Sequence, residues 1–168
     1  LLVLGAWHAG WTVALLPEHF CTKQKASALK LSGASILITQ DESFDVIEVD
    51  LMMTLNANAP EHSFDLWLGV PTAQASVEGY SWSNTETALV LFSSGSTGEP
   101  KGICHSVRNM LISAHRFIKH FSINKHDLLL NCAEIHTMSG FRGSVMLPLL
   151  SACQLYDAPF QRSLSNVL

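Results

Sequence analysis

Short apolar runs alternate with segments of helical periodicity along the first fifty residues. Gly10 and Gly33 are suited to the left-handed conformation in which helices often end, and Thr22 is a candidate helix cap. The predicted elements are a helix over 1–9, a strand over 11–17, a helix over 23–32, and strands over 34–40 and 44–50. This succession is typical of an α/β fold.

The middle of the chain lacks a sustained hydrophobic period. Residues 51–85 contain scattered proline, glycine and asparagine, so we expect a mostly irregular connection with one short helix. Trp67 and Trp82 are expected to pack this connection against the core, because large aromatic side chains bury well.

The pattern becomes regular again after residue 85. The predicted elements are a strand over 87–94, a helix over 105–122, a strand over 127–134, a helix over 139–152 and a strand over 153–158. The longest helix has Ser106 as a candidate N-cap, and its apolar residues recur at i, i+3, i+4 and i+7. Pro148 is expected to bend or interrupt the next helix.

These elements predict an α/β domain, rich in parallel sheet and layered, with helices on both faces. The strand over 127–134 is expected to lie parallel to the strand over 87–92, because the long helix joins them. Parallel strands end at one edge of a sheet, where such folds bind ligands. The segments that follow these two strands are therefore candidates for one site.

Composition and charge narrow the function classes. The chain has 168 residues, 48% of them hydrophobic and 14% charged, which favours one globular domain. Its formal net charge of −4 argues against nucleic-acid binding. No apolar run reaches the roughly 20 residues that span a bilayer, and we see no signal peptide.

Cysteine usage favours a cytoplasmic protein with reduced and mostly buried thiols. The four cysteines include no pair with CxxC spacing. Cys132 and His136 are four residues apart, but no second ligand pair lies near them in the sequence. We therefore predict no metal site.

A glycine-rich loop, SSGSTGEPKG at 93–102, follows the strand that begins at residue 87. Its glycines permit backbone N–H groups to turn inward around an anion, its hydroxyls add donors, and its lysine adds one compact positive charge. The candidate phosphate-binding residues are Ser93, Ser94, Gly95, Ser96, Thr97, Gly98 and Lys101. The loop lacks the spacing of a Walker A motif, since Pro100 stands where glycine is required. The alternative is a flexible Ser/Gly surface loop.

The same loop resembles the signature of the adenylate-forming superfamily, which includes acyl-CoA synthetases, luciferases and peptide-synthetase adenylation domains. The family pattern is close to [ST]-[ST]-G-[ST]-T-G-x-P-K-G, and nine positions of 93–102 fit it. GAWHAGWTVALLPEH and LKLSGASILIT resemble further family segments, so the resemblance covers most of the chain. One departure is Val107, which stands where the family commonly has histidine, and no role is assigned to it.

His136 is the second candidate. It lies in NCAEIHTMSGF (131–141), between a predicted strand and a predicted helix, where acyl-CoA synthetases often carry an aromatic or histidine residue beside the reacting carboxylate. The resemblance implies that His136 orients the acid, whereas the alternative is an ordinary structural histidine. Met138 and Phe141 border the acyl pocket or belong to the core. Peptide-synthetase adenylation domains carry an aspartate in this segment that anchors the amino group of an amino acid. No aspartate occurs in 131–141, so the resemblance implies plain carboxylic acids in place of amino acids.

The resemblance implies an AMP-forming acyl-CoA synthetase, in which ATP with Mg²⁺ and a carboxylic acid give an acyl-adenylate and CoA then receives the acyl group. Lys101 and His136 are the implied catalytic residues. The alternatives are an adenylation module that loads a carrier protein and a truncated, non-catalytic nucleotide-binding remnant.

The resemblance also implies that the chain is part of a longer protein. We expect 1–168 to be a partial N-terminal AMP-binding domain, because the later family motifs Y-G-x-T-E and T-G-D are absent. Its parts are an alternation of helices and strands (1–50), an irregular connection (51–85), and the phosphate loop with a following βαβ unit (86–168). We expect the rest of the protein to be needed for catalysis.

Overall fold

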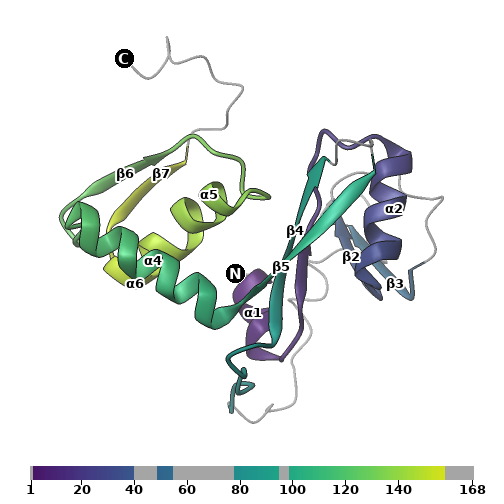
Figure 1. The fold of residues 1–168 in the computed structure, drawn as a ribbon, viewed down its shortest axis with the longest axis horizontal. Helices are drawn as coiled ribbons and strands as arrows, with labels where there is room; N and C mark the ends of the chain where they lie inside the picture. Colours follow the sequence, from purple (N-terminus) through teal and green to yellow (C-terminus); the bar gives the residue numbers. More distant parts are fainter. Residues whose placement is uncertain (1, 40–48, 55–77, 95–98, 158–168) are drawn as a thin grey trace.

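The computed structural model describes residues 2–39, 49–54, 78–94 and 99–157 (Figure 1). In chain order the helices and strands are α1 (Leu2–His8), β1 (Val13–Leu15), α2 (Thr22–Ser32), β2 (Ile36–Thr39), β3 (Leu51–Thr54), β4 (Thr87–Ser94), β5 (Pro100–Ser106), α4 (Val107–Phe121), β6 (Leu128–Asn131), α5 (Met138–Phe141), the π-helical η2 (Arg142–Met146), α6 (Leu147–Ser151) and β7 (Gln154–Asp157). No helix in these ranges is both long and apolar enough to cross a bilayer.

The described strands form three small sheets. β1, β4 and β5 make one, β2 and β3 a second, and β6 and β7 a third. All neighbours are parallel except β4 and β5, which form an antiparallel hairpin. The predicted α/β class is confirmed, but the prediction that β6 lies beside β4 is wrong. Both edges of β4 are already occupied, by β1 and β5, so β6 pairs with β7 instead.

Two glycines end helices as predicted. Gly10, after α1, has a φ of 79°, and Gly33, after α2, has a φ of 63°. At the start of α2 the prediction was wrong by one residue: Cys21 is the N-cap, and its backbone N–H donates to the side-chain oxygen of Gln24 at 3.1 Å. Thr22 is the first residue of the helix.

The strand predicted at 44–50 differs from the structure. Residues 44–48 lie outside the described ranges, and residues 49 and 50 are not in a strand. β3 occupies Leu51–Thr54 instead, inside the segment predicted to be irregular, and it runs parallel to β2 from Ile36↔Leu51 to Thr39↔Thr54. Its two central methionines have no strong strand preference, so tertiary pairing with β2 decides the strand.

The main core lies between β4, α4 and the helical segment that follows β6. Its buried members are Ala88, Leu89, Leu91, Met110, Ala114, Phe141, Met146 and Leu147. Trp82 packs against this core as predicted and donates from its indole nitrogen to the carbonyl of Trp7 at 2.9 Å. Trp67 lies outside the described residues. In Figure 1, α4 groups with α5, α6 and the β6–β7 pair, while α2 lies beside β2 and β3.

The helix predicted at 139–152 is continuous but changes its winding. The π-helical segment η2 lies between α5 and α6, and the backbone N–H of Leu147 bonds to the carbonyl of Arg142, five residues earlier. Pro148 follows immediately, and a proline has no N–H to give to the ordinary helical partner. The local widening therefore marks the predicted interruption.

All four cysteines are free, in agreement with the absence of a paired spacing. The expectation that most of them are buried is wrong. Cys21, Cys104 and Cys132 are exposed, and Cys153 alone of the four is buried.

Candidate functional site

The glycine-rich loop connects β4 to β5. Ser93 faces Lys101 and Ser94 faces Pro100 across this antiparallel pair, so the strands hold both ends of the loop close together. Residues 95–98, which include four of the predicted phosphate-binding residues, lie outside the described ranges.

The strand β5 was not predicted from the sequence. The long helix was predicted to begin at residue 105 with no strand before it, but Pro100–Ser106 form β5. The Ser106 hydroxyl accepts a hydrogen bond from the backbone N–H of Asn109 at 3.2 Å, which confirms it as the N-cap of α4. The loop is therefore anchored by a hairpin and not by a helix N-terminus.

Lys101 is exposed at the start of β5. Among the described residues no carboxylate forms an ion pair with it, whereas the neighbouring Glu99 pairs with Lys23 at 3.6 Å on the surface. The Lys101 ammonium group therefore remains available to an anion held by the loop.

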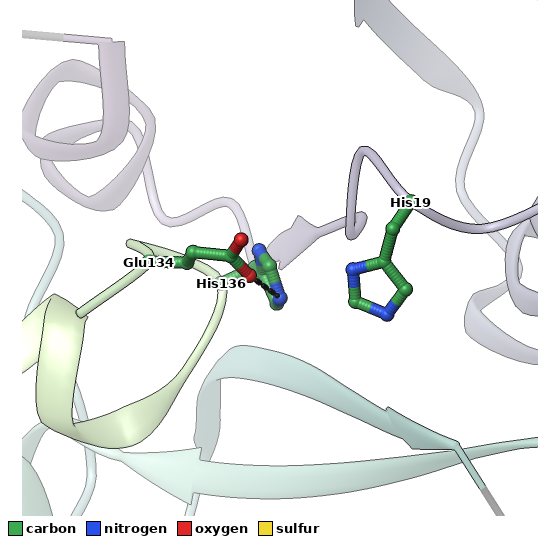
Figure 2. A group of neighbouring side chains, drawn as sticks. All are labelled: His19, Glu134 and His136. Atoms are coloured by element: carbon green, nitrogen blue, oxygen red, sulfur yellow. Dashed lines mark ion pairs between the residues drawn. The ribbon is translucent and has the colours of Figure 1, made fainter. Parts of the chain in front are cut away.

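His136 lies in a turn between β6 and α5, and its neighbour Glu134 comes from the same turn. The imidazole Nε2 is 3.0 Å from Oε2 of Glu134, with only 10% of the histidine side chain exposed and 49% of the glutamate side chain (Figure 2). His19, from the segment between β1 and α2, faces them with a ring-centroid distance of 5.4 Å to His136.

Hydrogen bonds hold this turn in shape. The Thr137 hydroxyl caps α5 by accepting from the N–H of Gly140 at 3.0 Å, and it donates to the carbonyl of Glu134 at 2.8 Å. Gly140 packs directly against the backbone of Glu134, where a Cβ atom would overlap with the carbonyl. Asn131 donates to the carbonyl of Ala133 at 2.8 Å, so both ends of the turn are fixed.

Burial sets the protonation of His136. Removal of water holds its pKa below the ordinary value, and the neighbouring His19 acts in the same direction. The carboxylates of Glu134 and, more weakly, Glu18 act in the opposite direction. The imidazole is therefore mainly neutral near pH 7 and carries one N–H. An ionised carboxylate only accepts hydrogen bonds, which places that hydrogen on Nε2, toward Glu134.

The same three side chains form a possible metal-binding group that the sequence did not indicate. His19, Glu134 and His136 each offer one ligand atom, and these atoms lie within 4.8 Å of one another. Two imidazoles and a carboxylate are suitable ligands for a divalent transition metal. Neither Glu134 nor His19 was assigned a role from the sequence. The position of His19 just after the β1 strand was the available signal.

An open cavity of about 760 Å³ adjoins this turn. Its lining includes Glu134, Thr137, Phe117, Arg142 and Leu147, and it does not include His136. Neither Met138 nor Phe141 is among its lining residues. Phe141 is fully buried and Met138 packs against the same core, so for these two side chains the structure favours the core interpretation.

The structure relates His136 to the strand that precedes the glycine-rich loop through β1, and not through the predicted pairing of β6 with β4. β1 and β4 are parallel, with Leu15 opposite Leu91, so their carboxyl ends lie side by side. His19 follows β1 and the glycine-rich loop follows β4, and His19 in turn contacts His136. The turn that bears His136 therefore comes to these strand ends although β6 belongs to another sheet.

The chain matches the model of one protein family, described as AMP-binding enzyme, over residues 1–166. It is 30% identical over 158 residues to a probable CoA ligase, CCL8, of Humulus lupulus, which covers 88% of this chain and 26% of that protein. It is 32% identical over 160 residues to the hybrid PKS-NRPS synthetase fsa1 of a Fusarium species, covering 94% of this chain and 4% of that protein. The chain thus spans about a quarter of the CoA ligase.

The fold is similar to that of O-succinylbenzoate CoA synthetase (MenE) from Bacillus subtilis. The structure in complex with AMP superposes with a TM-score of 0.77 at 21% identity, covering 98% of this chain and 41% of that one. A structure of the same enzyme in complex with ATP and magnesium ion gives a TM-score of 0.75. With the family match over 1–166, these findings show that the chain belongs to the AMP-binding, adenylate-forming enzyme family.

Proposed function

We propose that the protein containing this chain is an AMP-forming acid–thiol ligase of the acyl-CoA synthetase type. A carboxylate oxygen attacks the α-phosphorus of ATP, the bond to the bridging oxygen breaks, and pyrophosphate leaves. The sulfur of CoA then attacks the carbonyl carbon of the acyl-adenylate, AMP departs, and the thiol proton passes to solvent. This chain supplies groups for the first of these steps.

One observation carries the proposal: a carboxylate already lies 3.0 Å from Nε2 of the buried His136. Glu134 presents the same chemical group that a substrate acid would present. Its side chain is half-exposed and can turn into solvent, which leaves the Nε2–H donor for the substrate. Through this bond His136 would orient the acid for attack, and holding two reactants in line lowers the barrier substantially.

The glycine-rich loop is assigned to the phosphates of ATP. Ser93, Ser94 and Lys101 hold the ends of the loop, and 95–98 would supply backbone N–H groups and hydroxyls. Mg²⁺ would enter with the nucleotide and offset phosphate charge. The Lys101 ammonium, unpaired among the described residues, would stabilise the negative charge that develops on pyrophosphate as it leaves.

One feature favours CoA over a carrier protein as the acceptor. The segment 131–141 contains no aspartate that could anchor the amino group of an amino acid, which is the substrate class of peptide-synthetase modules. A carrier-loading module remains the second candidate, because fsa1, a PKS-NRPS synthetase, is a relative of similar identity. A location in the cytoplasm is part of the proposal and is supported by the free cysteines.

The test uses the full-length protein in which this chain occurs. Exchange of labelled pyrophosphate into ATP is measured with a panel of carboxylic acids, and AMP release is then measured with and without CoA. Acid-dependent exchange followed by CoA-dependent AMP release is expected. Exchange without any CoA-dependent release would favour the carrier-loading module. Absence of exchange with every acid would contradict the proposal and favour a non-catalytic protein.

A further inference from the structure

Arg142 is held between two helices at the wall of the cavity described above. Its Nη1 donates to the hydroxyl of Ser113 on α4 at 3.2 Å, and its Cζ lies 4.6 Å from the ring centroid of Phe117. It is also the first residue of η2, and π-helical segments frequently occur at functional sites.

The charge of this half-buried guanidinium group is not balanced. In the part of the chain that the structure describes, no carboxylate lies within ion-pairing distance of Arg142. Ser113 and Phe117 hold the group in place, but a hydroxyl and an aromatic ring neutralise no charge. A guanidinium group has five N–H donors, and Ser113 engages one nitrogen. Donors therefore remain for an anionic ligand.

The cavity has Arg142 and Glu134 in one lining, so it adjoins the candidate site through Glu134, although His136 itself is not a lining residue. Phe117, over which the guanidinium group lies, lines the cavity together with Arg142, and so does Glu134, which contacts His136. The volume of about 760 Å³ is in the usual range for small-molecule sites. The apolar part of the lining includes Leu129, Leu130 and Leu147. Such a cavity suits an acid with a carbon skeleton between two polar ends.

We propose that Arg142 binds a second carboxylate at the far end of the substrate, so that the protein activates dicarboxylic acids. This inference rests on the proposed function, in which the reacting carboxylate lies at His136. Arg142 is the only basic residue among those lining the cavity, and one cation matches a singly charged carboxylate better than a doubly charged phosphate. The planar guanidinium fork also fits a carboxylate with two parallel hydrogen bonds.

The experiment measures pyrophosphate exchange by the full-length protein with matched acids. Straight-chain dicarboxylic acids from succinate to suberate are each compared with the monocarboxylic acid of the same length. The dicarboxylic acids are expected to have the higher kcat/KM. Arg142→Gln should lower this value about 10- to 100-fold for dicarboxylic acids, because a charge-assisted contact is lost. It should leave the value for monocarboxylic acids within about twofold, because they make no such contact.

Two further variants keep the result interpretable. Arg116→Gln removes an exposed arginine of α4 that does not line this cavity, and it should change neither value. Arg142→Lys keeps the charge and an apolar stem over Phe117 but loses the planar guanidinium fork. It should therefore give a preference for dicarboxylic acids between those of the unaltered protein and Arg142→Gln. If Arg142→Gln does not fold, Arg142→Lys provides the test.

The outcomes separate this inference from the proposed function. Equal use of both acid classes by the unaltered protein, or an equal loss for both classes in Arg142→Gln, would overturn the role of Arg142 and leave the ligase intact. Absence of exchange with every acid would overturn the proposed function and the substrate class with it.

Discussion

The imidazole Nε2 of His136 lies 3.0 Å from the carboxylate of Glu134, two residues earlier in the same turn. The histidine is buried and the glutamate is half-exposed, so the pair consists of a fixed donor and a movable acceptor. In the proposed reaction a substrate carboxylate takes the place of Glu134. In the free protein the proposed carboxylate-binding nitrogen of His136 is therefore already paired with Glu134.

Replacement of Glu134 should make the acid bind more readily. Glu134→Ala removes both a competing acceptor for Nε2–H and a negative charge that repels the substrate, so KM for the acid should fall while KM for ATP stays unchanged. It should also lower the pKa of His136, because the Glu134 charge raises that pKa. Kinetics and an NMR titration of His136 measure the two effects. A KM for the acid that rises would show that Glu134 supports binding.

Replacement of His136 should affect the acid and not the nucleotide. His136→Ala removes one hydrogen bond to a charged group, which is worth about 1.5–3 kcal/mol, or about 10- to 100-fold in kcat/KM for the acid. The apparent affinity for ATP should change little. His120→Ala, an exposed histidine on α4, is the control. A collapse of ATP affinity with normal acid dependence would contradict the assignment, and no change in either would identify a structural histidine.

Lys101→Ala should weaken the first half-reaction. Loss of one charge-assisted phosphate contact costs about 1.5–3 kcal/mol in the transition state, so pyrophosphate exchange at subsaturating ATP should fall about 10- to 100-fold. Lys23→Ala removes a cation from the surface pair with Glu99 and should leave exchange unchanged. Normal exchange in Lys101→Ala would remove this residue from the phosphate site.

The stability of the protein should rise with pH on passing from acid to neutral conditions. Burial lowers the pKa values of both His136 and His105 in the folded state, so the unfolded chain binds more protons between each folded pKa and about 6.5. The contribution of these two histidines to the free energy of unfolding is complete above about pH 6.5. It is lost as the pH falls through the folded pKa of each histidine. Urea unfolding across this range measures the slope. His136→Gln should reduce it, and His105→Gln should remove a further part. An unchanged slope in both variants would contradict the prediction.

Gly10→Ala should destabilise the fold by about 1–3 kcal/mol. The φ of Gly10 is 79°, and an added Cβ would lie 2.6 Å from the ring of Tyr80, so backbone strain and a clash act together. Gly5→Ala, inside the helix α1 that Gly10 follows, is the matched control. No heavy atom lies within 4 Å of the Cβ position at Gly5, and alanine there should stabilise the helix by about 0.5–1 kcal/mol. Urea unfolding of the two variants should give effects of opposite sign.

The local pattern of the sequence determined several elements because their causes are themselves local. The apolar stripe from Val107 to Phe121 and the hydroxyl of Ser106 specify α4, and Gly10 and Gly33 end helices because they adopt positive φ. The order of residues in 93–102 likewise indicated the family, which the match over 1–166 confirms.

Tertiary structure decided what depends on pairing between distant segments. The sequence could not show that β1 and β5 occupy both edges of β4, so the predicted parallel pair of β4 and β6 was wrong. β3 is a strand because β2 pairs with it. His19 has no motif of its own and becomes part of the candidate site only because β1 and β4 end side by side. Local preferences are carried by a few neighbouring residues, whereas strand order and side-chain clusters arise from contacts between residues far apart in the chain.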